Sequence, residues 1–168
     1  TKVSLPLGGS VGLSVQAISP DRGGDTGPVS VTLFGSELGG EDTVKLVTAG
    51  QPDIMAQDTR AKEDGRSLSA KFDLTGKARG GYDVGVTRQG GASASLPSAF
   101  LVEEGRAPRI WVDIVGLNPI GVSRKSRFTI LIGNLGNVDA FGTLIWIGGI
   151  PKNATIELGF FDGQIPPL

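Results

Sequence analysis

The 168-residue chain contains no cysteine and no histidine. Without cysteine no disulfide can form, so packed apolar cores must supply the stability of the fold. Histidine is the commonest general base and the commonest protein ligand of transition metals. A serine nucleophile of the familiar kind needs such a base, and no motif for another nucleophile is present. We therefore expect a protein without catalytic residues, not an enzyme.

Long apolar runs and an excess of basic residues are also missing. A transmembrane helix needs about 20 consecutive apolar residues, and the apolar cluster at 144–147 is far shorter. The chain has 16 basic and 17 acidic residues, a net charge of −1, and only 6% aromatic residues. Such a balance does not attract a phosphate backbone. We expect no membrane insertion and no nucleic acid as a partner.

Glycine and proline, by contrast, are abundant, with 27 and 10 residues. This content is typical of many short strands joined by tight turns. Residues 29–34 show this pattern, because Val29, Val31 and Leu33 alternate with Ser30 and residues 32 and 34, as in a half-buried strand. Similar segments predict strands at 43–48, 53–56, 68–74, 82–87, 99–102, 110–115, 127–132, 143–147 and 154–158, while 58–66 is interpreted as a charged loop. The expected fold class is all-β.

Several structural motifs lie between residues 15 and 104. Ile18-Ser-Pro20 precedes a glycine-rich turn, and the strand that follows ends in Gly35-x-x-Leu38. Later come Leu68-x-Ala-x-Phe-Asp-Leu74, Gly80-Gly-Tyr-Asp-Val-x-Val86 and Ala99-Phe-x-Val102. This arrangement resembles the IPT/TIG-type immunoglobulin-like domains. The resemblance implies an immunoglobulin-like antiparallel β-sandwich over residues 15–105 and is nearly silent on function. Residues 1–14 are interpreted as an N-terminal strand or the tail of a preceding domain.

A second unit is expected over residues 106–168, after a short linker at 105–108. Its strands surround the segment Asn134-x-Gly-Asn-x-Asp-Ala140, which resembles the CARDB-like and related bacterial adhesion repeats over about residues 109–158. A complete sandwich needs about seven strands and about 100 residues, so this unit is expected to be a partial, truncated β-sandwich. Its exposed strands are expected to pack on the first unit, to borrow residues 1–14, or to pair in a homo-oligomer.

Four acidic residues are weak calcium candidates. Calcium takes six to eight oxygen ligands, and Asp21, Asp25, Glu41 and Asp42 are expected in turns near one end of the first unit. Arg22 lies between the first two, and no known calcium-loop spacing is present. The competing interpretation is that these aspartates only shape turns through their own side chains, and we expect no cofactor unless calcium is bound.

The two tryptophans are the candidate interaction residues. Trp111 falls opposite to Ile110 and Val112 in its expected strand, and Trp146 is out of phase with its isoleucine neighbours. An exposed tryptophan can stack on a sugar or anchor an interface. The alternative is that both pack between the two units or between copies of the chain.

The families that the sequence resembles occur in tandem arrays of large bacterial secreted or surface proteins. The resemblance therefore implies a non-catalytic structural, adhesion or protein-interaction module, located outside the cell or on its surface. Its partners would be neighbouring domains of the same chain, with a protein or glycan as ligand. The alternative is an accessory, carbohydrate-binding domain of a secreted enzyme. Because the first residue is Thr1 and not methionine, we interpret the chain as a piece of a longer protein.

Overall fold

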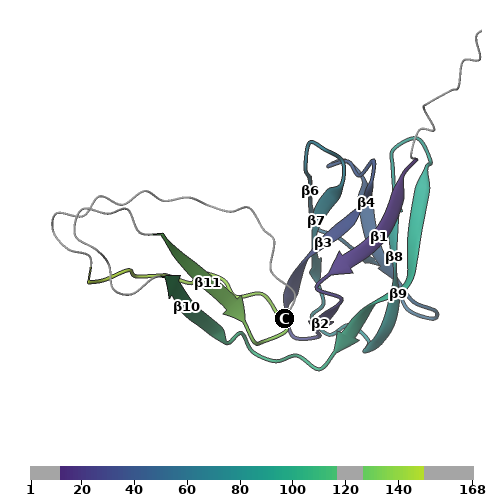
Figure 1. Cartoon of the computed structure of the whole chain (residues 1–168). Helices are drawn as coiled ribbons and strands as arrows, with labels where there is room; N and C mark the ends of the chain where they lie inside the picture. Colours follow the sequence, from purple (N-terminus) through teal and green to yellow (C-terminus); the bar gives the residue numbers. More distant parts are fainter. Residues whose placement is uncertain (1–11, 117–126, 150–168) are drawn as a thin grey trace, which may run out of the picture.

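A computed structural model describes residues 12–116 and 127–149 of the chain (Figure 1). Within these residues there are eleven β-strands, arranged in three sheets, and no helix. The expectation of an all-β fold is thus confirmed. The described part of the chain accordingly offers no helix long and apolar enough to span a membrane.

The first sheet has four antiparallel strands in the spatial order β1-β3-β7-β6. Strand β3 pairs along its length with β7, so that Val31 lies opposite Ala70 and Leu33 opposite Leu68. The strand bounds are β1 Ser14–Ser19, β3 Pro28–Ser36, β6 Asp58–Ala61 and β7 Ser67–Asp73.

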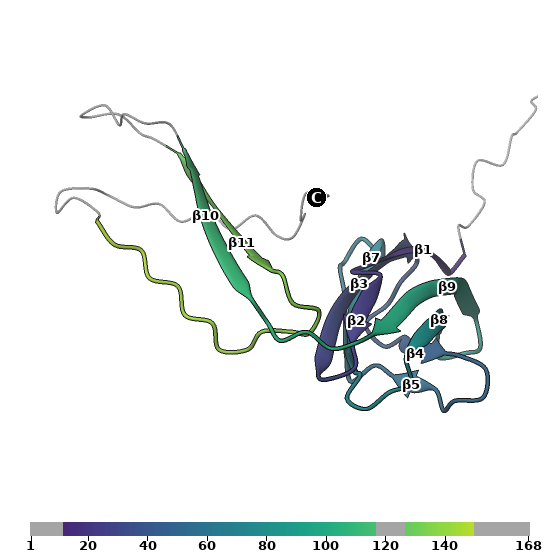
Figure 2. The ribbon, with the colours of Figure 1, turned by 90° about the horizontal axis from the view of Figure 1, so that it is seen from below.

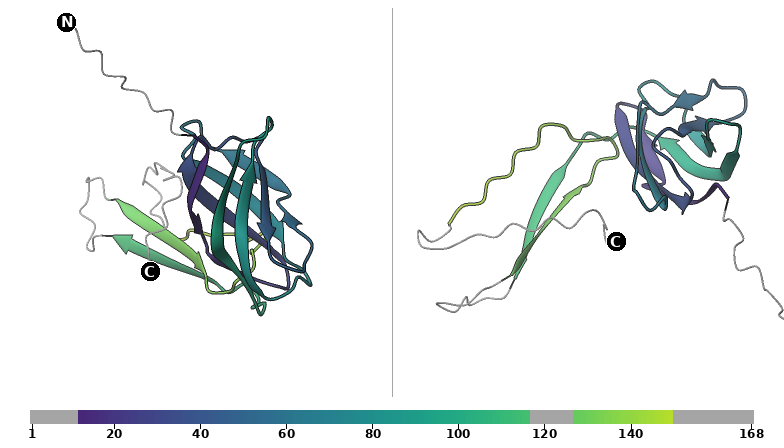
Figure 3. Two further views of the ribbon diagram at one scale, coloured as in Figure 1. Left: turned by 90° about the vertical axis from the view of Figure 1, so that its right-hand side faces the viewer. Right: turned by 90° about the horizontal axis from the view of Figure 1, so that it is seen from above.

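The second sheet has five strands in the order β2-β9-β8-β4-β5, and it curls around the apolar interior (Figure 3). All its pairs are antiparallel except β2 with β9, which is parallel. Its strands are β2 Arg22–Gly24, β4 Thr43–Val47, β5 Ile54–Met55, β8 Gly80–Thr87 and β9 Ser93–Glu103. We call β1–β9 the first unit.

The third sheet is a two-stranded antiparallel ribbon, which we call the arm. It consists of β10 Ile110–Gly116 and β11 Phe128–Asn134. The arm projects away from the first unit (Figure 1), and a segment without strand structure, 140–149, follows it (Figure 2).

Alternate side chains of both larger sheets form one apolar core. In β3 the residues Val29, Val31 and Leu33 are buried, as the alternation predicts. Rings from the two sheets meet in this core, since the centroids of Phe72 in β7 and Phe100 in β9 are 6.4 Å apart. The remaining members of the core cluster are Val15, Leu38, Val44, Leu46, Ile54, Leu68, Ala70, Leu74, Tyr82, Val84, Val86, Val102 and Val138.

Two local predictions are wrong. Residues 58–61, expected in a charged loop, form β6, because their backbone pairs with β7 and such pairing does not require apolar side chains. Residues 143–147, expected as a strand, do not form one, because no strand in the described part of the chain pairs with them. The expected strand at 154–158 and most of the segment 1–14 lie outside the described residues.

The core predicts the effect of removing one of its rings. Phe72 is completely buried, so Phe72→Ala should lower the free energy of unfolding by about 3–5 kcal/mol through lost burial and a residual cavity. Ser69→Ala, at an exposed position of the same strand, should change it by less than about 0.5 kcal/mol. Chemical denaturation followed by circular dichroism measures both. Equal effects of the two variants would contradict the assignment of Phe72 to the core.

Candidate interaction surface

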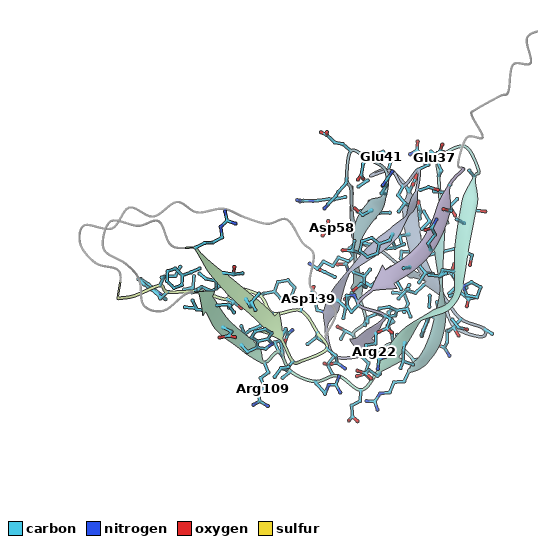
Figure 4. The ribbon with its side chains drawn as sticks, viewed as in Figure 1. Arg22, Glu37, Glu41, Asp58, Arg109 and Asp139 are labelled. Carbon is cyan, nitrogen blue, oxygen red and sulfur yellow. The ribbon has the colours of Figure 1, made fainter. Side chains whose placement is uncertain are left out.

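The four calcium candidates do not lie together. Asp21 and Asp25 flank β2, whereas Glu41 and Asp42 precede β4. Figure 4 places the labelled Arg22 and Glu41 at opposite ends of the first unit. The expectation that all four lie near one end is therefore wrong. Among the residues that the structure describes, no group of three or more side chains suited to a metal ion is found.

Asp21 and Asp25 are each engaged by arginine. Arg22 Nε donates to Asp21 at 3.0 Å, and this bond holds the pKa of that carboxyl below its usual value. Asp25 accepts from Arg79 Nε at 2.6 Å and from the backbone N–H of Gly105 at 2.8 Å. These two bonds, the arginine first, lower the pKa of Asp25. Both carboxylates thus have structural partners.

Asp42 is engaged as well, although it lies at the other end. Its side chain is buried and accepts from the backbone N–H of Gly39 at 2.7 Å, which shapes the turn before β4. Arg88 Nε lies 3.5 Å from the same carboxylate, and its Nη1 lies 3.2 Å from Glu37. Glu41, next to it, is exposed. The turn-forming interpretation accounts for the contacts of Asp42.

An open groove of about 430 Å³ lies along β4, β8 and β9. Its lining includes Lys45, which is paired with Asp53 at 2.7 Å, together with Asp83, Thr87 and Ser95. Among the described residues that line this groove, none is aromatic. It therefore lacks the flat apolar surface on which a sugar ring stacks.

The two tryptophans differ in exposure. Trp111 is half-buried in β10, and its indole lies over Gly133 of β11, where an added Cβ would collide with the ring. Trp146 follows the arm in the segment without strand structure, and its side chain is 91% exposed. Only Trp146 therefore presents a free ring.

The register of the arm gathers apolar side chains on one face. Val112 lies opposite Ile132, Ile114 opposite Ile130, and Gly116 opposite Phe128. Directly opposed residues of an antiparallel pair share a face. The apolar face of the arm thus consists of Ile110, Val112, Ile114, Phe128, Ile130 and Ile132, with Asn134 at its foot.

This apolar face is open to solvent. The exposed fractions are 49% for Val112, 58% for Ile114 and 52% for Ile132. Beyond the arm, Phe141, Leu144 and Trp146 are also exposed, by 65%, 82% and 91%. Exposed apolar patches are typical of interaction sites. The other face of the arm is mixed and includes Asp113 and Thr129.

Sequence reasoning finds the two halves of this face but not the residues that hold it in place. The alternation predicts the apolar sets of 110–115 and 127–132 separately, and the register brings them together. For Asn134, Asn137 and Asp139 the sequence indicates only a turn, yet all three bond to groups outside it. The available signal is the clustering of three short polar side chains, which often satisfy backbone groups.

Comparison with known protein families finds none that matches this chain, and comparison with curated proteins finds no significant match. The division of the chain at residue 105 and the two family resemblances therefore stay predictions.

The contacts of Asp25 predict a pH dependence of stability. Because its pKa lies below the ordinary 3.8, its stabilisation is present above about pH 4 and is lost as the pH falls through the folded-state pKa. Asp25→Asn should lower the stability at neutral pH and make its fall in acid shallower. Arg79→Gln should act in the same direction. Thermal unfolding from pH 7 to pH 2 measures this, and parallel curves for wild type and Asp25→Asn would contradict it.

Proposed function

We propose that the chain is a non-catalytic structural, adhesion or protein-interaction module of a larger secreted or cell-surface bacterial protein. In this proposal the first unit is an IPT/TIG-like immunoglobulin sandwich, and the arm begins a CARDB-like sandwich. The shared core of two β-sheets supports the first assignment. The polar turn between β11 and Ala140 supports the second, since its residues match the motif quoted for that family.

The single observation that carries this function is the exposed apolar face of the arm. The face carries no charged side chain. Contact with another apolar surface would therefore stabilise it through burial and not through ion pairs. An isolated two-stranded ribbon is also marginally stable in water. Both properties favour a second β-layer as the partner of the arm.

A neighbouring domain is the partner that this proposal names first. A β-layer packs on another at about 10 Å through alternate apolar side chains, and the arm presents such an alternation on both strands. A second copy of the chain, joined through its exposed strands, is the other source of such a layer. The module then connects neighbours and sets the distance between them, without chemistry of its own.

The apolar face predicts self-association of the chain when no neighbouring domain is present. Light scattering coupled to size-exclusion chromatography should show an average mass that rises with concentration. The double variant Ile114→Ser/Ile132→Ser should remain monomeric, because it removes two of the most exposed apolar side chains of the face. Thr129→Ser, on the opposite face, should behave as wild type. A wild-type chain that is monomeric at every concentration and binds no apolar dye would contradict an interaction role for this face.

Exposure of Trp146 favours the alternative, an accessory carbohydrate-binding domain. A sugar stacked on its ring would change the tryptophan fluorescence. Titration with soluble polysaccharides should therefore give a saturable change that is lost in Trp146→Ala and kept in Trp111→Phe. A module that only binds protein predicts no saturable change with any polysaccharide.

A further inference from the structure

We propose that Asn137 and Asp139 lock the arm to the first unit, so that both move as one rigid body. The arm has two feet, residues 104–109 before β10 and residues 134–139, which begin at the last residue of β11. Figure 2 shows both feet meeting the first unit at the same end, beside β2 and β9. We call these feet the joint. The proposal concerns how rigidly the arm is held and does not depend on what covers the apolar face.

Asn137 bonds to both the first unit and the first foot. Its backbone oxygen accepts from Gly24 N–H in β2 at 2.7 Å. Its side-chain oxygen accepts from the backbone N–H of Arg106 at 2.6 Å. Its side-chain nitrogen donates to Glu103 Oε1 at 2.9 Å and to the backbone oxygen of Glu104 at 2.8 Å. One side chain thus fastens the end of β9, the first foot and the second foot together.

Asp139 bonds to the edge of β3 beyond the end of β1. Because the β1 pairing starts at Ser19 opposite Thr32, the first residues of β3 have no β1 partner. Asp139 takes this place. Its backbone N–H donates to the oxygen of Pro28 at 2.9 Å, and its carboxylate accepts from the N–H of Ser30 at 3.0 Å and from its hydroxyl at 2.7 Å (Figure 4 labels Asp139). The second foot is therefore hydrogen-bonded to the part of the β3 edge that β1 leaves unpaired.

Apolar and steric contacts reinforce these bonds. Val138, between the two polar anchors, is buried as a member of the core cluster of the first unit. Gly24 lies so close to the Asn137 side chain that an added Cβ would overlap it, and a Cβ on Gly136 would collide with the oxygen of Ala107. Both glycines thus permit the close approach on which the joint depends.

The two feet are also bonded to each other. Asn134 accepts from the backbone N–H groups of Arg109 and Gly136, each at 2.9 Å, and the N–H of Leu135 donates to the oxygen of Arg109 at 2.9 Å. Free rotation at 104–109 would break several of these bonds at once. The joint therefore holds the arm at one angle. A partner that binds the arm then loses less affinity to the conformational entropy of ordering it.

Pulsed electron paramagnetic resonance tests this rigidity. The chain has no cysteine, so Ser69→Cys in β7 and Thr129→Cys in β11, both at exposed positions, place two spin labels without further changes. In the otherwise wild-type chain, diluted with an excess of unlabelled chain so that labels on different molecules do not contribute, we expect a single narrow distance distribution. Adding Asn137→Ala and Asp139→Ala should broaden it until no single peak remains. Asp53→Ala, which removes an exposed ion pair with Lys45 far from the joint in sequence, should leave it narrow.

Limited proteolysis gives a second readout at the joint. Arg106 is an exposed trypsin site whose backbone N–H is bonded to Asn137, so Asn137→Ala should raise cleavage there by at least about tenfold. If the double variant fails to fold, the milder Asp139→Asn replaces it. This variant keeps one acceptor oxygen and should give a smaller rise in cleavage. A broad distribution in the wild type, or a narrow one in a folded double variant, would overturn the proposal. Neither result bears on self-association, so failure of the joint and failure of the proposed function remain distinguishable.

Discussion

The rest of the structure depends on the apolar core between the two larger sheets. With no disulfide available, the contact of Phe72 with Phe100 and the alternate side chains around it supply the stabilisation. The same core reaches the C-terminal part of the chain through Val138. Burial of this one valine draws residues 134–139 against the first unit, where Asn137 and Asp139 can then bond. The core of the first unit thus positions the arm, although no residue of β10 or β11 belongs to that core.

The arm shows the opposite balance of forces. Its two strands satisfy each other's backbone groups in a regular register, yet its apolar face buries little, and Ile114 remains 58% exposed. A sheet of this kind gains stability only when a further layer covers it. The first unit is therefore stable through its own buried core, whereas the apolar face of the arm would be buried only by a partner.

The acidic residues have structural roles where the structure describes their contacts. Asp25 joins Arg79 to the backbone of Gly105, Asp42 shapes a turn, and Asp139 occupies a sheet edge. From the sequence alone, Asp21 and Asp42 are expected at the same end of the first unit. The fold places them at opposite ends, because Asp21 precedes β2 and Asp42 precedes β4. Turn residues can be recognised from sequence, but the direction in which each turn points depends on the strands beside it.

The sequence by itself determined the strand alternation, because a period of two is a local property of extended backbone. Val29, Val31 and Leu33, like the two isoleucine-rich strands of the arm, can be assigned to faces from their spacing alone. Only the tertiary structure decided the partners. Whether a segment forms a strand depends on which backbone edge lies beside it. This holds for the parallel pairing of β2 with β9, for the strand at 58–61 and for the lack of a strand at 143–147. The bond from Gly24 to Asn137 depends on the tertiary structure in the same way, because hydrogen bonds between distant segments exist only once the core has brought their backbones together.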